Sequence, residues 1–159
     1  MLNGWREPVT LVTAVGCGLV GGVFFAFSAF VMPALRGLPV PDGISAMQAI
    51  NIHAPRAALG TALVLPALGA AALVGAALLG HGKGRTALVV GGAILYLVGS
   101  LGVAGGLNVP LNDTLAAVDP TTAAGSAVWR EYLTDWTRWN HVRATSSLLA
   151  SAMFALALR

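Results

Sequence analysis

The chain alternates between long uncharged apolar stretches and shorter polar connections. Residues 9–35, 57–80 and 86–107 contain no Asp, Glu, Lys or Arg, and each has the roughly 20 residues that a helix needs to cross a bilayer. A fourth uncharged stretch, 144–158, is long enough only if its helix begins earlier, in the aromatic segment before it. The pattern predicts an all-α protein, a four-transmembrane-helix bundle with spans at about 9–33, 57–79, 86–107 and 141–158. These spans form one integral membrane domain over residues 1–159.

The two longer connections are each predicted to hold a short amphipathic helix. In the first, the sequence S-A-M-Q at 45–48 fits a capping box, so a helix is expected to begin there. Gln48 and Asn51 then share one helix face, because they are three residues apart. Before this connection, Met32-Pro33 is expected to end or kink the first span.

In the second connection, Asn108 and Asn112 are four residues apart, with Pro110 in what would be a first helical turn. Proline is tolerated there, and both amides would then project from one face. Asp119-Pro120 is expected to break this helix. A new helix is predicted to begin in T-T-A-A-G-S at 121–126 and to continue through the aromatic segment into span four.

Glycines inside the spans predict close helix packing. Gly18 and Gly22 form a GxxxG pair, and Gly92, Gly99 and Gly106 repeat every seven residues. Such stripes let neighbouring helices approach closely, and they permit self-association into a homo-oligomer.

The composition agrees with a membrane protein. Hydrophobic residues make up 57% of the chain and charged residues 9%, whereas soluble domains have about a quarter charged residues. The net charge of +3 is dispersed, so nothing suggests nucleic acid as a partner. The compact basic loop with Lys83 and Arg85 favours an N-in, C-in orientation. The single cysteine, Cys17, lies in span one and is expected to be a packing residue.

The polar chemistry concentrates next to the last span, in W-T-R-W-N-H-V-R at 136–143. At 100° per residue, a helix from residue 129 onward has one aromatic face with embedded polar groups. His141 falls on the opposite, plainly polar face. The aromatic face consists of Trp129, Tyr132, Trp136, Trp139, Asn140, Arg143 and Ser147.

Structural roles stay open beside functional ones for these residues. Trp129 and Tyr132 suit an interfacial aromatic belt, and Arg143 could snorkel to the headgroups. Asn108 and Asn112 could cap a helix, and His53 and His141 could lie at the surface. A functional role is favoured by the cost of placing polar groups at membrane depth.

Known cofactor and nucleophile motifs are absent from the sequence. It has no HxxxH, CxxC, carboxylate cluster, GxSxG, or GxGxxG in a βαβ pattern. His53 and His141 could meet on one side of the membrane, but two histidines make an incomplete site for most metals. We therefore predict no metal site and no resident cofactor, although a bound metal stays open.

Four segments, taken in order, resemble the DUF1772 family, also called the anthrone oxygenase family of small integral membrane proteins. They are F-F-A-F-S-A-F-V-M-P-A-L at 24–35, M-Q-A-I-N at 47–51, N-V-P-L-N-D-T-L-A at 108–116 and W-R-E-Y-L-T-D-W-T-R-W-N-H-V-R at 129–143. The resemblance extends from about Gly16 to Ala150. The family positions that it carries over are Asn108, Pro110, Asn112, Trp129, Tyr132, Trp136, Asn140 and Arg143.

The resemblance implies a membrane-embedded, cofactor-independent oxygenase. Its co-substrate would be O2, and its substrate an anthrone-like polycyclic aromatic polyketide, oxidised to a quinone. It also implies an integral protein of the bacterial inner (cytoplasmic) membrane, with the lipid bilayer and an aromatic small molecule as partners.

Such chemistry needs an aromatic slot, fixed hydrogen-bond donors and a way to remove a proton. The expected donors are Arg143, Asn140, Asn108 and Asn112. The base would be His141 or His53, or the substrate would lose its proton to water with Arg143 lowering its pKa. The expected substrate-binding residues are Trp136, Trp139, Tyr132, Trp129, Phe24, Phe27, Phe30, Asn51 and Gln48.

Two other functions stay open at this stage. One is a non-enzymatic membrane protein that binds a small molecule or serves as an accessory subunit; it would bind ligand without consuming oxygen. The other is a metal- or haem-dependent membrane redox protein, which a visible absorption spectrum or a metal analysis would detect.

Overall fold

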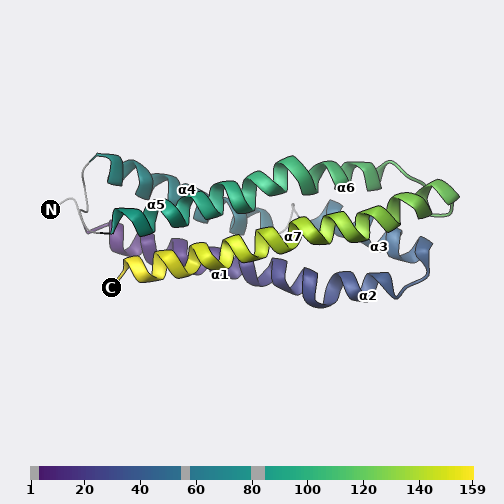
Figure 1. Cartoon of the computed structure of the whole chain (residues 1–159), viewed down its shortest axis with the longest axis horizontal. Helices are drawn as coiled ribbons and strands as arrows, with labels where there is room; N and C mark the ends of the chain where they lie inside the picture. The colour runs from purple at the N-terminus through teal and green to yellow at the C-terminus, as the bar shows by residue number, and fades with distance from the viewer. Residues whose placement is uncertain (1–3, 55–57, 80–84) are drawn as a thin grey trace.

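The structure, a computed structural model, describes residues 4–54, 58–79 and 85–159, and every regular element in these ranges is helical (Figure 1). The elements merge into five helical segments. They are α1 (Arg6–Ala26), continuing through the π-helical η1 (Phe27–Val31) into α2 (Met32–Arg36); α3 (Val40–His53); α4 (Ala58–Leu78); α5 (Thr86–Ile94), continuing through the π-helical η3 (Leu95–Gly102) and η4 (Ala104–Asn108) into α6 (Val109–Ala116); and α7 (Ala123–Ala157).

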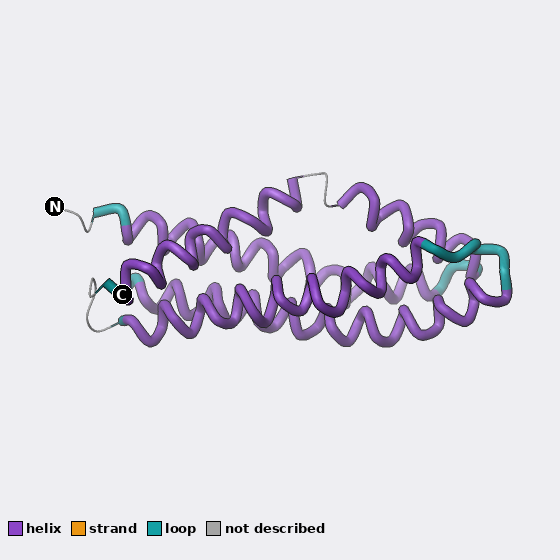
Figure 2. Tube along the Cα trace, turned by 90° about the horizontal axis from the view of Figure 1, so that it is seen from above, coloured by secondary structure: helices purple, strands orange, loops and turns teal. Residues whose placement is uncertain are grey.

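The long segments run side by side along one axis (Figures 1 and 2). The start of α1, the end of α7 and the ends of α4 and α5 that follow each other in the chain lie at one end of the molecule. The short helix α3 lies toward the other end, with α2 and α6 (Figure 1). Helix α7 packs against α1, α5 and η3, and α1 also packs against α4.

Three helices are long and apolar enough to cross a membrane, namely Arg6–Arg36, Leu59–Leu78 and Thr86–Ala116. These correspond to the first three predicted spans and fit an integral membrane protein. Helix α7 is the longest of the described helices, but its first half carries the polar aromatic segment, and it is not among the three.

Helix α4 is shorter than the other three long helical segments. At 1.5 Å per residue, α4 rises about 32 Å, close to the roughly 30 Å of a bilayer's hydrocarbon core. Helix α7, with 35 residues, rises about 52 Å. The longer segments therefore extend well past the first turn of α4, and α3 packs beside them there, against α2, α6 and α7.

Two hydrophobic clusters fill the molecule, one beside α4 and one beside α3. The first includes Cys17, Val20, Phe24, Leu73, Tyr96 and Phe154. The second includes Met32, Ile44, Met47, Leu115, Trp129, Tyr132 and Trp136. Three of the four large aromatic side chains in residues 129–139, namely Trp129, Tyr132 and Trp136, thus pack in the second cluster.

The helices of the structure begin and end differently from the prediction at three places. Helix α3 begins at Val40, not at Ser45, because Pro39 is its N-cap and a proline stands in its first turn, where the fixed φ suits a helix. Met32-Pro33 does not end the first helix, since Pro33 falls at the start of α2, directly after the π-helical turn. Span three does not end at 107 but continues through η4 into α6. The second connection therefore has no separate helix.

The break before α7 is confirmed. Helix α6 ends at Ala116, and α7 begins at Ala123 with Thr122 as N-cap, whose Oγ1 accepts from the N–H of Gly125 at 3.0 Å. In the turn between them, Asp119 accepts from the N–H of Thr121 at 2.8 Å and from its hydroxyl at 2.7 Å. These hydrogen bonds lower the pKa of the Asp119 carboxyl.

The glycine stripes hold only in part. A Cβ at Gly22 or at Gly106 would meet no atom within 4 Å, so neither glycine is needed for the packing seen here. At Gly21, by contrast, a Cβ would lie 2.8 Å from Cγ of Leu148 on α7. Gly92 and Gly99 also face α7 at short range. The close packing is therefore real, and in span one it involves Gly18, whose Cβ would lie 3.0 Å from Oγ of Ser151 on α7, together with Gly21 in place of Gly22.

Candidate functional site

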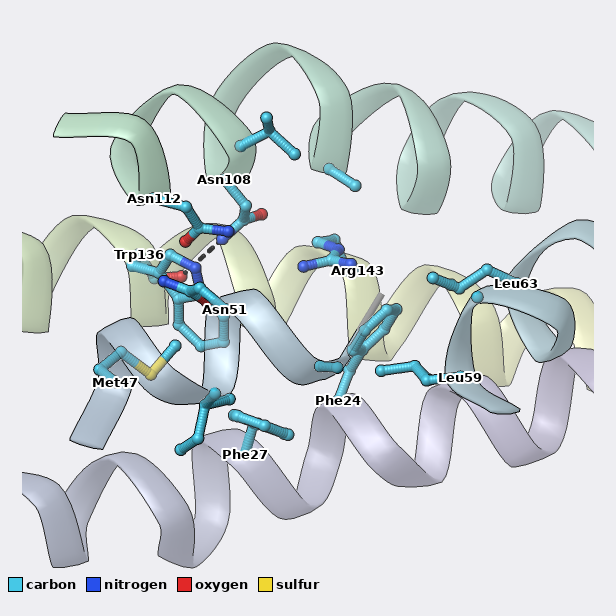
Figure 3. Close-up of a pocket in the computed structure, with 15 residues that line it drawn as sticks. Phe24, Phe27, Met47, Asn51, Leu59, Leu63, Asn108, Asn112, Trp136 and Arg143 are labelled. Atoms are coloured by element: carbon cyan, nitrogen blue, oxygen red, sulfur yellow. Dashed lines mark hydrogen bonds between the residues drawn. The ribbon is translucent and has the colours of Figure 1, made fainter. Parts of the chain in front are cut away.

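A cavity of about 250 Å³ lies where the two hydrophobic clusters meet (Figure 3). It is bounded by the end of α1, by η1, by α3, by the first turns of α4, by η4 and α6, and by the middle of α7. Its volume is near the lower end of small-molecule sites, which run from roughly 300 Å³ upward. The lining residues are Phe24, Phe27, Met47, Ile50, Asn51, Ala54, Leu59, Gly60, Leu63, Ala104, Asn108, Val109, Asn112, Trp136 and Arg143.

Among the described residues that line the cavity, only Arg143 is charged. Its side chain is 8% exposed, and its guanidinium carbon lies 3.8 Å from the centre of the Phe24 ring. The Nε–H has no hydrogen-bond partner, and no ion pair joins the guanidinium to a carboxylate in the described parts of the chain. A guanidinium stays charged at neutral pH. The cavity therefore contains an uncompensated cation, which is costly in an apolar site unless a ligand uses it.

Two more unpaired polar atoms belong to lining residues. Asn108 is 1% exposed, and its Nδ2 donates to the carbonyl of Trp136 at 3.1 Å, the dashed line in Figure 3. Its Oδ1 has no partner, and neither has the indole N–H of Trp136. Buried polar atoms are usually paired, so unpaired atoms in three residues that line one cavity are unusual. Asn108 does not cap α6 with its side chain.

The amides of Asn51 and Asn112 meet at the hydroxyl of Tyr132. The hydroxyl donates to Oδ1 of Asn112 at 2.8 Å and accepts from Nδ2 of Asn51 at 3.3 Å. Both asparagines line the cavity, while Tyr132 stands behind them. About one helical turn before Asn51 in α3, Gln48 donates to the carbonyls of Leu115 and Val118 at 2.9 and 3.0 Å. These amides fix α3 against the end of α6.

Asn140 holds the first helix in place through buried hydrogen bonds. It is fully buried, and its Nδ2 donates to the carbonyl of Phe24 at 2.7 Å and to Oγ of Ser28 at 2.8 Å. The π-helical turn η1 begins three residues after Phe24, and such turns disturb the regular bonding of carbonyls. Asn140 therefore fixes the backbone that carries Phe24, and it does not line the cavity.

Aromatic rings form a stacked row along α7. Trp129 and Tyr132 stack with centroids 5.7 Å apart, and Tyr132 and Trp136 stack at 5.9 Å. Phe27 adds a tilted contact with Trp136 at 5.8 Å. Trp129, Tyr132 and Trp136 of the predicted aromatic face are thus buried as one row, and of these three only Trp136 lines the cavity.

The cavity brings together half of the predicted site residues. Those in its lining are Phe24, Phe27, Asn51, Asn108, Asn112, Trp136 and Arg143. Those that do not line it are Gln48, Trp129, Tyr132 and Asn140, which pack or bond behind it, and Trp139, which lies beside Arg138 with its ring 5.4 Å from the guanidinium carbon. Phe30 is 62% exposed.

Both histidines offered as bases are exposed and outside the lining. His141 lies on the polar face of α7, as the helical wheel predicted. His53 lies at the last residue of α3. Neither side chain contacts the cavity in this structure. Lys83, on which the predicted orientation depends, lies outside the described residues.

The sequence analysis did not predict the apolar side chains that line the cavity, among them Met47, Ile50, Leu59, Leu63 and Ala104. Met47 carries a weak signal, because it is four residues before Asn51 and shares a helix face with it. Leu59 and Leu63 at the start of α4, and Ala104 in η4, carry none, since they look like any other span residue. In the described ranges, no group of three or more His, Cys, Asp or Glu side chains could hold a metal ion.

The comparisons with known proteins identify the family of the chain. The family model described as anthrone oxygenase matches residues 49–153, more than half of the chain. The matched range includes Asn51, Asn108, Asn112, Trp136 and Arg143. Neither the curated proteins nor the solved structures gave a match. The chain belongs to the anthrone oxygenase family.

Proposed function

We propose that the protein is a membrane-embedded, cofactor-independent oxygenase that oxidises an anthrone-like polycyclic aromatic compound with O2 to a quinone. Family membership supports oxygenase chemistry in general. The observation that supports this reaction best is Arg143, a buried cation with no counterion in the described part of the chain, in a cavity whose other walls are mostly apolar. A flat aromatic that becomes an anion during the reaction would match both properties.

The reaction starts when the substrate loses a proton. Loss of one benzylic proton from an anthrone gives an aromatic oxyanion, and this electron-rich anion transfers one electron to O2. The resulting carbon radical and superoxide combine, and a proton completes a hydroperoxide at the benzylic carbon. Loss of water from it leaves the second carbonyl. One anthrone and one O2 thus yield one anthraquinone and one water, a monooxygenase balance that needs no external reductant.

Arg143 would stabilise the oxyanion. A fixed donor aimed at developing charge in a dry site is worth about 3–4 kcal/mol. The Nε–H of Arg143 and the indole N–H of Trp136 are buried donors without partners among the described residues, and both side chains line the cavity. Phe24, Phe27 and Trp136 would hold the ring system between their faces.

No histidine in the cavity serves as the base in this proposal. His53 and His141 lie outside the lining, so the substrate would lose its proton to water. A neighbouring cation lowers the pKa of an acid by favouring its charged form. Arg143 would therefore replace a base by making the substrate more acidic.

We place the protein in a bacterial cytoplasmic membrane with four crossings, the fourth formed by the second half of α7. The start of α1 and the end of α7 lie at the same end of the bundle (Figure 1), which an even number of crossings requires. The N-in, C-in orientation rests on the basic loop at Lys83 and Arg85.

Oxygen uptake tests the proposal directly. Purified protein in detergent, treated with a chelator, is given anthrone, and O2 consumption and anthraquinone formation are measured together. Uptake above the spontaneous rate with one quinone per O2 supports a metal-independent oxygenase. Folded protein that binds anthrone and consumes no O2 would contradict it and favour a non-enzymatic binding protein.

A further inference from the structure

The hydroxyl of Tyr132 couples the two amides at one end of the cavity. A phenol hydroxyl has one hydrogen, and here it is given to Oδ1 of Asn112. The hydroxyl can then only accept from Asn51, and it does so from Nδ2. The three residues come from α7, α6 and α3, so the contact joins elements that are distant in the chain.

This coupling fixes what the cavity offers to a ligand. Asn112 has its oxygen occupied, which leaves its N–H groups free, and Asn51 has an N–H group occupied, which leaves its oxygen free. Turning both amides over at once exchanges the roles but still leaves one donor and one acceptor. Turning only one amide leaves either the hydroxyl hydrogen without an acceptor or one amide oxygen without a donor. The hydroxyl is therefore fully paired only when one amide offers its oxygen to the cavity and the other its N–H groups.

Packing holds the Tyr132 ring in place independently of its hydroxyl. The side chain is 1% exposed and is stacked between Trp129 and Trp136, with interplanar angles of 16° and 22°. Replacing Tyr132 with phenylalanine would keep the ring and both stacked contacts. The substitution therefore removes one hydroxyl and little else.

We propose that Tyr132 is a positioning residue that makes this end of the cavity selective for an aromatic substrate with a ring hydroxyl. Such a hydroxyl can donate to Oδ1 of Asn51 and accept from Nδ2 of Asn112, the reverse of the two hydrogen bonds that the hydroxyl of Tyr132 makes with the same amides. Holding both amides in advance removes part of the ordering cost of binding. The inference rests on the proposed function, because it names the kind of anthrone that the same cavity takes.

The test compares two substrates on Tyr132→Phe and on the unaltered protein. One substrate is anthrone, and the other is a monohydroxyanthrone whose hydroxyl lies away from the ketone and so forms no internal hydrogen bond. The readout is the ratio of kcat/KM for the hydroxyanthrone to that for anthrone. The loss of one oriented hydrogen-bonding pair is expected to lower this ratio about tenfold, through a higher KM. An equal loss on both substrates, or an unchanged ratio, would overturn the inference.

Two further variants separate this role from a general effect. Thr134→Val removes an exposed hydroxyl from the same helix, one that bonds only within α7, and should leave the ratio unchanged. In an Asn112→Leu background the amide pair is already lost, so adding Tyr132→Phe should change the ratio no further. An additional tenfold fall in that background would contradict coupling through Asn112.

Binding separates failure of this inference from failure of the proposed function. Quenching of tryptophan fluorescence gives the affinity for both compounds without turnover. If neither compound drives oxygen uptake, the proposed function fails. A tenfold loss of binding preference in Tyr132→Phe would still support the positioning role. An unchanged binding preference would overturn it.

Discussion

Replacing Arg143 with methionine should move stability and turnover in opposite directions. Methionine keeps an unbranched chain of similar length and can fill the same apolar space. It removes a guanidinium that is buried, has an unpaired Nε–H and forms no ion pair with a described carboxylate. The experiment therefore asks whether the protein keeps a destabilising charge because its reaction needs it.

The magnitudes follow from the surroundings of the guanidinium. Burying a charge costs several kcal/mol even after relaxation, while the cation–π contact with Phe24 at 3.8 Å returns about 2 kcal/mol. Exchange of buried ionic groups for apolar ones typically stabilises by about 1–4 kcal/mol. Loss of one donor to a developing oxyanion lowers kcat by about 10²–10³-fold. Arg143→Met should thus unfold at a higher temperature and turn over at least a hundred times more slowly.

The assay pairs thermal unfolding in detergent with oxygen uptake on anthrone. Arg138→Met is the matched control, since Arg138 lies on the same helix but is exposed and outside the cavity lining. It should change neither quantity by more than the scatter of surface substitutions, about 0.5 kcal/mol in stability. An Arg143→Met protein that keeps its turnover would refute the oxyanion role. If the activity of Arg143→Met falls only as far as the fraction of folded protein falls, the role of Arg143 is purely structural.

Three further predictions concern the frame around the cavity. Asn140→Ala should destabilise by about 1–3 kcal/mol, because it removes two buried hydrogen bonds, to the Phe24 carbonyl and to the Ser28 hydroxyl; an unchanged unfolding temperature with lost turnover would instead place Asn140 against the substrate. Gly21→Ala should lower the unfolding temperature, whereas Gly22→Ala, with open space around its Cβ, should be neutral or gain up to about 1 kcal/mol. Cys17 is fully buried, so a maleimide should label it only after unfolding; rapid labelling of folded protein would contradict its packing.

Most of the fold could be predicted from the sequence, because membrane helices appear as long runs of uncharged, apolar residues. Uncharged runs of more than 20 residues locate three membrane helices well. The helix ends were harder. Pro33 and Pro110 looked like boundaries, yet both fall where α2 and α6 resume after π-helical turns. Local sequence does not reveal such turns, since tertiary packing decides where a helix widens.

The site was readable where chemistry and helical spacing agreed. The wheel placed Trp136 and Arg143 on one face, and both line the cavity. It could not tell Asn140 from Arg143, which share that face, because only the position of η1 decides that Asn140 bonds to the Phe24 carbonyl. It also could not find Leu59 or Leu63, whose role depends on where the first turn of α4 stands against the other helices.

The short length of α4 has a consequence for kinetics. Only this described span matches the thickness of the hydrocarbon core, and its first turns form a wall of the cavity. The cavity is then level with the boundary of the bilayer, where a flat, lipophilic substrate already accumulates. Turnover should follow the mole fraction of substrate dissolved in the membrane, not its concentration in bulk water. Substrate-free vesicles added at constant total substrate should therefore slow the reaction, and an apparent KM has meaning only when the amount of lipid is stated.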